Sequence, residues 1–297
     1  MKKVLVIGSS NIDYVAKVDN FPKIGETIKS NSFDTFIGGK GLNQAIACSL
    51  AGGNVTFFTS LGNDANKDVI VNYINKYNIK LVYLTKNCST GNAMIFVNAN
   101  NAENMIVVNG GSNMMMSTSD IDDNIKLIDD SDIILLQLEI PIDVMNYVVK
   151  IAKDRGKMVL LNPAPYQKLD KNILSDLDYI IPNQTELAMI CNNDDTYLCN
   201  AKYLYDKYGV KVITTLGKDG SILVGNKIIK IDSIKVKSID TTGAGDCYCG
   251  TFVAYLSLGY SVKDAMKKAS LASGLSTTRN GASNSYYSVD EIDKINL

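Results

Sequence analysis

Short continuous apolar runs alternate with helical patterns along most of this chain of 297 residues, and this alternation constrains the fold more than any other feature. Apolar runs without polar alternation are typical of parallel strands buried on both faces. Such runs occur at residues 4–7, 55–59, 133–138, 158–161, 179–181 and 212–215, and helical patterns at 43–50, 67–77, 142–153, 185–190 and 201–208. The pattern predicts an α/β fold, a doubly wound and mostly parallel sheet with helices on both faces.

Two segments interrupt the alternation. Residues 13–37 and 92–109 contain extended stretches with no helix between them, and we expect antiparallel strands inserted off the main sheet. They would form a small β-sheet lid over the carboxyl edge, where open α/β sheets bind ligands. A hairpin is expected over 221–231, with closing helices over 244–258, 262–276 and 289–295. Because no linker or internal repeat divides the chain, we expect a single domain, residues 1–297, with this lid.

Composition excludes several classes of chemistry. The chain contains no histidine, so Ser-His-Asp and Cys-His catalysis and the common histidine metal sites are excluded. Acid–base catalysis then falls to Asp, Glu, Lys, Tyr or Cys. Thirty Lys and Arg residues balance 31 Asp and Glu residues, leaving a net charge of -1. That balance argues against a nucleic acid or a membrane surface as the partner.

The cysteines and the apolar segments indicate where the protein resides. The six cysteines form neither a CxxC pair nor the spacing of a disulfide framework. The apolar run at residues 4–7 is too short for a signal peptide, and the weakly polar stretch at 247–260 is too short for a membrane span. We therefore expect a soluble cytoplasmic protein with reduced thiols.

The segment with the densest chemistry is the sequence DTTGAGD at residues 240–246, directly before a helical apolar run. Neither a P-loop nor a GxGxxG dinucleotide motif occurs elsewhere in the chain. Small residues at the start of a helix leave backbone N–H groups free, and the helix dipole favours an anion there. Asp246 would lie in the first helical turn, where Asp is also common for dipole reasons alone.

Polar residues gather at other predicted strand ends. Residues 38–45, GGKGLNQA, combine tandem glycines with Lys and Asn, and Asn11 and Asp13 follow the first strand. Each set is compatible with a plain glycine turn or with a site that binds sugar hydroxyls. Asn183 and Glu186 fit a helix capping box equally well as a hard-cation site that holds the water shell of Mg²⁺.

Taken together, these segments resemble the PfkB family of carbohydrate kinases over essentially the whole chain. GGKGxNQA followed by DTTGAGD is highly specific for this family. The further matches are SxNxD at 9–13, FPxxGET at 21–27, STG at 89–91, QLE at 137–139, NPAP at 162–165, NxxE at 183–186 and TRxGA at 278–282.

The resemblance implies transfer of the γ-phosphoryl group of ATP to the primary 5-hydroxyl of D-ribose. It assigns Asp246 as the general base and the N–H groups of Gly243, Ala244 and Gly245 as an anion hole. A kinase for another small sugar or for a nucleoside is the first alternative, with Tyr14 and Phe96 as examples of residues that could line a base pocket. A catalytically silent binding protein is the second alternative.

The same resemblance implies the remaining site residues. The sugar would contact Asn11, Asp13, Gly39, Lys40, Asn43, Glu139 and Asp246. ATP would contact Asn183, Thr215, Gly217, Gly220 and Gly245. Asn183 and Glu186 would hold Mg²⁺ through water. A K⁺ ion would be held by Asp240 and Thr242, by main-chain oxygens near Ser276, Arg279 and Gly281, and by Ser285. Because the lid strands have edges that need covering, we also expect a homodimer through the lid.

The sequence departs from the family pattern directly after Asp246. Cys247 and Cys249 stand where the family usually has a Thr-Phe-x-Gly sequence. Buried cysteines behave as small apolar side chains, and this is the interpretation we favour; the alternative is a redox-sensitive kinase.

Overall fold

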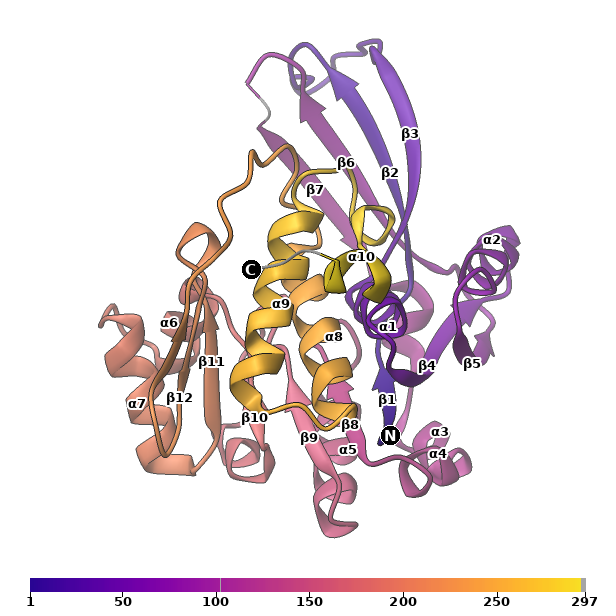
Figure 1. Ribbon diagram of the computed structural model, residues 1–297. Coiled ribbons are helices and arrows are strands. Elements are labelled where there is room, and N and C mark those ends of the chain that lie inside the picture. The colour runs from indigo at the N-terminus through magenta and orange to yellow at the C-terminus, as the bar shows by residue number, and fades with distance from the viewer. Residues whose placement is uncertain (102, 295–297) are drawn as a thin grey trace.

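The computed structural model describes residues 1–101 and 103–294, which form two β-sheets and the helices that cover the larger one (Figure 1). The larger sheet has nine strands in the order β13-β12-β11-β10-β9-β8-β1-β4-β5. They are β1 (Lys3–Ile7), β4 (Asn54–Gly62), β5 (Ile79–Lys86), β8 (Ile133–Leu136), β9 (Met158–Leu161), β10 (Tyr179–Ile180), β11 (Lys211–Thr215), β12 (Ser221–Val224) and β13 (Ile229–Ile231). Every neighbouring pair from β5 to β11 is parallel, which confirms the predicted doubly wound sheet.

Successive side chains of the central strand β1 enter different cores. Val4 and Val6 belong to one buried cluster, whereas Leu5 and Ile7 belong to the other, because side chains alternate across a strand. The first face is covered by α1 (Lys40–Leu50), α2 (Ala65–Ile74), α8 (Ala244–Ser257), α9 (Val262–Ser276) and α10 (Val289–Asp293). The second is covered by α3 (Thr118–Asp123), α4 (Ile125–Asp129), α5 (Ile142–Asp154), α6 (Gln184–Cys191) and α7 (Tyr197–Tyr208). Among the described residues, no helix combines the length and apolar character needed to cross a membrane.

The smaller sheet is the lid, which projects beyond one end of the main sheet (Figure 1). Its strands are β2 (Asn11–Val18), β3 (Ser32–Gly38), β6 (Gly91–Asn98) and β7 (Asn104–Asn109), in the order β3-β2-β6-β7. The expectation that all of these strands pair antiparallel is wrong for the central pair, because β2 and β6 are parallel. Each follows a parallel strand of the main sheet, β1 or β5, so both leave the same carboxyl edge in the same direction.

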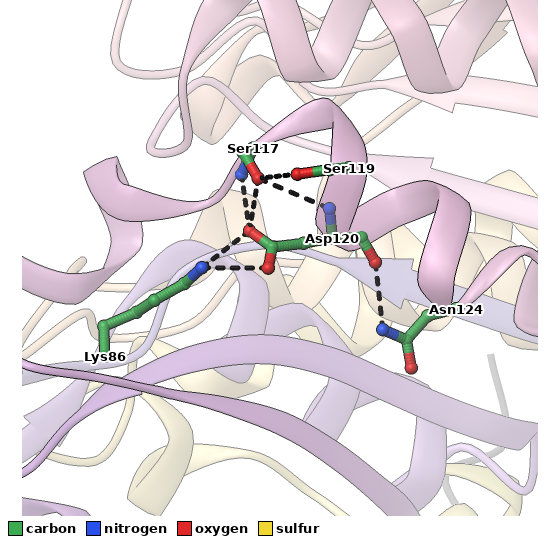
Figure 2. Close-up of polar contacts among 5 residues, drawn as sticks. All are labelled: Lys86, Ser117, Ser119, Asp120 and Asn124. Carbon is green, nitrogen blue, oxygen red and sulfur yellow. Dashed lines mark hydrogen bonds and ion pairs between the residues drawn. The ribbon is translucent and has the colours of Figure 1, made fainter.

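The structure also contains elements that the sequence pattern did not indicate. The edge strand β5 contains an apolar run at residues 81–84, but this run belongs to none of the elements predicted from the sequence, and all of the strand's residues are exposed or partly buried. Lys86 at its end pairs with both carboxylate oxygens of Asp120 in α3, at 2.9 and 2.7 Å (Figure 2). Asp120 also completes a capping box with Ser117. These contacts attach the short helix α3 to the sheet edge.

Most predicted boundaries lie within a few residues of those observed. The predicted strand 133–138 ends at Leu136, so Gln137 lies beyond it, and the helix predicted from residue 43 begins at Lys40. The helix predicted over 289–295 is observed as Val289–Asp293, and residue 295 lies outside the described residues.

Strand order places a crevice between β1 and β8. After β1 and the first lid strands the chain continues to β4 and β5 on one side, whereas β8 to β11 lie on the other. Ligands of open α/β sheets bind at the carboxyl ends of strands where the order reverses in this way. The lid stands at this edge, with β2 following directly after β1.

Candidate active site

Residues that follow β1 and β8 meet at this reversal of strand order. Ser9, after β1, donates from its hydroxyl to Oε2 of Glu139, after β8, at 2.5 Å. The backbone N–H of Lys40 donates to the same oxygen at 2.9 Å. Gly39 has φ of 97°, and a Cβ there would lie 2.8 Å from the Cα of Ser10. Only glycine therefore allows the start of α1 to lie directly on the loop after β1.

Asp13 on β2 is a carboxylate without a hydrogen-bond partner among the described residues. Burial, together with the smaller effect of the negative charge of Glu139, raises the pKa of Asp13 from 3.8 to about 6. Within residues 1–101 and 103–294, the Asp13 side chain accepts no hydrogen bond. A Cβ at Gly38 would lie 2.4 Å from an Asp13 carboxylate oxygen, so this glycine makes room for it. Such a carboxylate is suited to accept hydrogen bonds from the hydroxyls of a ligand.

The amide of Asn11 is oriented by a residue that the sequence did not indicate. Asn113 donates from Nδ2 to Oδ1 of Asn11 at 2.8 Å. Asn113 is itself fixed by the backbone of Ser10, whose N–H donates to its Oδ1 at 3.0 Å. With its oxygen occupied, Asn11 offers its amide nitrogen as the group for a ligand.

The start of α8 has unpartnered backbone donors. Gly243 is left-handed, with φ of 73°, and no side chain caps the helix. The N–H groups of Gly243 and Gly245 donate to no acceptor in the part of the chain that the structure describes. The third predicted donor is already paired, because the N–H of Ala244 donates to the carbonyl of Thr241 at 3.2 Å. This helix terminus can therefore bind an anion through two free N–H groups and the helix dipole.

Asp246 lies in the first turn of α8 and is 5% exposed. Each of its carboxylate oxygens receives one amide N–H. Gln44 donates to Oδ1 at 2.9 Å, and Asn43 donates to Oδ2 at 3.2 Å. Oδ1 of Asn43 is buried and has no partner in the described residues, so it can accept a hydrogen bond from a ligand.

Lys40 connects the two sides of the crevice. The negative charges of Asp246, Glu139 and Glu186 raise the pKa of Lys40, whereas burial opposes them. The ammonium group therefore lies in the combined field of three carboxylates from three separate segments. The structure thus brings the predicted sugar-side residues and the predicted base into one cluster.

A pocket of about 270 Å³ adjoins the start of α8. Its lining includes three residues predicted to contact the nucleotide, Thr215, Gly217 and Gly220, together with Gly245. On the other side it is bounded by α9, through Ser270, Ser273, Gly274 and Thr277. The pocket therefore lies between the loops after β11 and the last long helix, next to the free N–H groups.

Asn183 and Glu186 form a capping box at the start of α6, which confirms one of the two interpretations of this motif. The Asn183 oxygen accepts from the Glu186 N–H at 2.8 Å, and Oε2 of Glu186 accepts from the Asn183 N–H at 2.9 Å. Burial and the charge of Asp246 raise the pKa of Glu186, whereas the charge of Lys40 lowers it. Among the described residues, no group of three or more His, Cys, Asp or Glu side chains is placed to hold a metal.

The predicted potassium residues lie on two loops, which Asp240 joins, and at the end of α9. Its two carboxylate oxygens accept from the N–H groups of Thr242 at 2.9 Å and Gly281 at 2.8 Å. These hydrogen bonds lower the pKa of Asp240 in spite of its partial burial. Tyr286 then donates to the carbonyl of Gly243 at 2.8 Å, so the second loop also contacts the anion site.

The other predicted potassium residues have partners of their own. The hydroxyl of Ser276 donates to the carbonyl of Ser273 at 2.8 Å, and that of Ser285 donates to the carbonyl of Ala282 at 2.7 Å. The guanidinium of Arg279 pairs with Glu291 at 3.1 Å, and because it is a cation without an acceptor, the candidate ligand at this residue is the backbone carbonyl.

Cys247 and Cys249 are each 1% exposed on α8. Burial raises the pKa of Cys247 to about 12 and raises the pKa of Cys249 well above its ordinary value. Thiols that do not ionise near neutral pH are poor nucleophiles, which favours a packing role for both.

Sequence reasoning missed the polar residues that support the site. Ser9, Gln44, Gln137 and Asn162 occur in the quoted motifs but had no assigned role, and Asn113 lies in no motif. Their position at the ends of buried strands or at a helix start was the available signal.

Comparison with known proteins agrees with this geometry. A family model described as "pfkB family carbohydrate kinase" matches residues 1–288. The chain is 35% identical over 303 residues to a ribokinase of Staphylococcus aureus, covering 99% of each protein. It is 33% identical over 299 residues to a deoxyribokinase of Salmonella typhi, covering 98% of this chain and 97% of that protein.

Two further relatives complete the comparison. The chain is 37% identical over 295 residues to a bifunctional ribokinase/ribose-5-phosphate isomerase A of Fructilactobacillus sanfranciscensis; the match covers 96% of this chain and 54% of that protein, so the chain spans about half its length. The solved structure of an Arabidopsis thaliana ribokinase complexed with ribose and ATP has a TM-score of 0.90 and 28% identity, covering 99% of each chain. The chain therefore belongs to the pfkB family of carbohydrate kinases.

Proposed function

We propose that the protein transfers the γ-phosphoryl group of ATP to the 5-hydroxyl of D-ribose, giving D-ribose 5-phosphate. The observation that carries this proposal is the position of Asp246. Its buried carboxylate lies beside the free N–H groups at the start of α8, between the cluster around Lys40 and the pocket of about 270 Å³. The site thus has a proton acceptor next to an anion site, which phosphoryl transfer to a hydroxyl requires.

The sugar side of the crevice offers acceptors and donors for a polyol. Among the residues that the structure describes, the Asp13 carboxylate has no hydrogen-bond partner, and neither has the buried Oδ1 of Asn43. Asn11 can donate from its amide nitrogen, Glu139 can accept through Oε1, and Lys40 can donate from its ammonium group. Ribose in this crevice would bind its hydroxyls to these groups, with Gly39 allowing its close approach to the backbone.

At the reacting centre Asp246 removes the proton of the attacking hydroxyl. The N–H groups of Gly243 and Gly245 and the dipole of α8 then stabilise the charge on the transferred phosphoryl group. A single donor of this kind is worth about 10² to 10³ in kcat. The Ala244 N–H joins them only where its contact to Thr241 opens.

The residues at the site fit the predicted ions. Oε2 of Glu186 accepts the capping hydrogen bond, which leaves Oε1 to face a ligand. The negative charge of Asp246 near this carboxylate favours a divalent cation there. Asn183 and Glu186 would hold Mg²⁺ through water, and the ion supplies charge neutralisation for the phosphates of ATP. Carbonyl oxygens of Arg279 and Gly281, near the anchored Asp240, suit a K⁺ ion.

The potassium site predicts a dependence on the salt present. An ion bound between the two loops would stabilise the arrangement in which Tyr286 contacts Gly243. We expect kcat to be higher in potassium chloride than in sodium or choline chloride at equal ionic strength. Equal rates in the three salts would remove the K⁺ assignment but leave the kinase assignment intact.

The acceptor is tested with a panel of D-ribose, 2-deoxy-D-ribose, other small sugars and nucleosides, with ADP production as the readout. We expect the highest kcat/KM for ribose. The deoxyribokinase relative makes 2-deoxyribose the closest competitor. Higher kcat/KM for deoxyribose or a nucleoside would replace ribose as the substrate.

The role of Asp246 is tested by Asp246→Asn. We expect turnover to fall at least 10³-fold, with ATP binding retained by calorimetry, because the amide cannot accept the hydroxyl proton. Full activity in this variant would overturn the mechanism, and unchanged ATP binding verifies that the pocket is intact.

We also propose that the protein is a cytoplasmic homodimer joined through its lids. The outer lid strand β7 exposes adjacent apolar side chains, with Ile106 and Val107 52% and 66% exposed. Because successive residues point to opposite faces, both faces of this edge strand present apolar surface. Size-exclusion chromatography with light scattering should show a dimer for the wild type and a monomer for Val107→Lys; a wild-type monomer would contradict the proposal.

A further inference from the structure

A chain of three buried carboxamides lies behind the Asp246 carboxylate. Gln44 donates from Nε2 to Oδ1 of Asp246 at 2.9 Å and to Oδ1 of Asn162 at 3.0 Å. Gln137 donates from Nε2 to Oε1 of Gln44 at 2.7 Å. Gln44 and Gln137 are both 0% exposed. The chain therefore runs from the ends of β8 and β9 to the first turn of α8.

The orientation of every amide in this chain is determined by groups that can only accept. Asn162 donates from Nδ2 to the carbonyl of Ile181 at 2.9 Å, so its oxygen faces Gln44. Asp246 presents a carboxylate, so Gln44 must direct its NH₂ group toward both acceptors. The Gln44 oxygen then points away from them and needs a donor, which Gln137 supplies.

We propose that Gln44 is a positioning residue for the general base, and that Gln137 supports it by donating to the Gln44 oxygen. This inference rests on the proposed function, because it assigns Gln44 a task only if Asp246 accepts the hydroxyl proton. The hydrogen bond to Oδ1 holds the carboxylate in one orientation and leaves its other oxygen to Asn43 and the acceptor hydroxyl. Gln44 itself is not assigned any contact with substrate.

The pH dependence of kcat provides a readout of this hydrogen bond. A donor to an ionised carboxylate stabilises the charged form, so loss of the Gln44 donor should move the acid limb of the kcat profile to higher pH. The other charged or titratable groups around Asp246 are Lys40 on α1, Glu186 on α6, Tyr286, and the thiols of Cys247 and Cys249 on α8. None of these is altered by a substitution at Gln44, so a shift in the pH profile reports on the Gln44 contact.

The experiment measures kcat between pH 5 and pH 9, at saturating ATP and saturating acceptor, for Gln44→Met and Gln44→Glu. Met has a similar volume and removes the donor, so we expect kcat to fall about 10- to 100-fold. The acid limb, where kcat falls as the pH is lowered, should move to higher pH by about one unit. Glu places a second carboxyl group beside Asp246. Because two neighbouring carboxyl groups share a proton, the acid limb should move to a higher pH than in Gln44→Met. The KM for ATP should stay within about twofold.

Gln167→Met is the matched control. The Gln167 amide also donates to a carbonyl, that of Leu138 at 2.6 Å, but it has no contact with Asp246. We expect its kcat and its pH profile to be those of the wild type. If neither Gln44 variant folds, Gln137→Met leaves the buried Gln44 oxygen without its donor and so weakens the hold on the Gln44 amide, and a smaller shift of the acid limb in the same direction is expected.

The outcomes distinguish a failure of the role inferred for Gln44 from a failure of the proposed function. Folded Gln44 and Gln137 variants with lower melting temperatures but an unshifted acid limb would assign these residues to packing and overturn the inference. Full activity of Asp246→Asn would instead overturn the proposed base. If another sugar replaces ribose in the panel, the pH profiles are measured with that sugar, and the same two outcomes apply.

Discussion

Asp13→Asn should make the protein more stable at neutral pH while weakening its binding of sugar. Burial, with the charge of Glu139, raises the pKa of Asp13 from 3.8 to about 6. Within the described residues this carboxylate receives no hydrogen bond that would offset its loss of hydration. Asn has nearly the same shape and no charge, so it removes the unfavourable term without opening a cavity.

The sign and size of the effect follow from the raised pKa. The folded protein binds a proton at Asp13 more tightly than the unfolded chain does, so stability is lost as pH rises through the folded pKa of about 6. The difference from 3.8 corresponds to about 3 kcal/mol at 1.36 kcal/mol per unit, an upper limit because the side chain is partly exposed. Asp13→Asn should recover up to about 3 kcal/mol at pH 8 and about half of that at pH 5.

The assay is thermal unfolding of the protein without sugar or ATP, followed by circular dichroism at both pH values. For a chain of this length, about 3 kcal/mol corresponds to roughly 5 °C in Tm. In the wild type, the KM for sugar should fall as pH rises through about 6, because an ionised Asp13 is the stronger acceptor of hydroxyl hydrogen bonds. In Asp13→Asn that pH dependence should disappear and the KM should be higher throughout.

The control is Asp34→Asn, which changes an exposed carboxylate on the lid strand β3. We expect it to leave Tm within about 1 °C at both pH values, as surface substitutions usually do. A destabilised Asp13→Asn at pH 8, or a gain in Tm that is equal at pH 5 and pH 8, would refute the reasoning.

Two further predictions concern the start of α8. Gly243→Ala places a Cβ at positive φ within 2.8 Å of the Cβ of Ala282, so we expect about 1 to 2 kcal/mol of lost stability and at least a tenfold fall in kcat; a wild-type kcat would show that this turn does not shape the anion site. Iodoacetamide at pH 7.5 should alkylate the exposed Cys199 and spare Cys247 and Cys249, with activity unchanged. Peptide mass spectrometry checks this, and activity lost together with alkylation of either buried thiol would support a redox role instead.

The sequence predicted the layers of the fold because buried parallel strands and amphipathic helices each have their own spacing of apolar residues. The strand β9 and the helix α9 have the predicted boundaries, since turn residues bound each apolar pattern closely. The edge strand β5 was not predicted although it contains four consecutive apolar residues, and none of its residues is fully buried, because it lies at the edge of the sheet. Parallel pairing of β2 with β6 was also missed, since no local pattern encodes which distant strand becomes a neighbour.

For the site, the motifs by themselves determined the family and predicted the base and the segments that carry the polar groups. Asp246, Lys40 and Glu139 lie far apart in the sequence, and their residue types do not state that Lys40 would lie in the fields of both carboxylates. Only the tertiary structure decided that the Asn183–Glu186 pair forms a capping box and that Gln137 and Gln44 are aligned behind the base. The reason is physical: a hydrogen bond depends on distance and direction between groups, and these are set by the packing of β8, α1 and α8 rather than by any one segment.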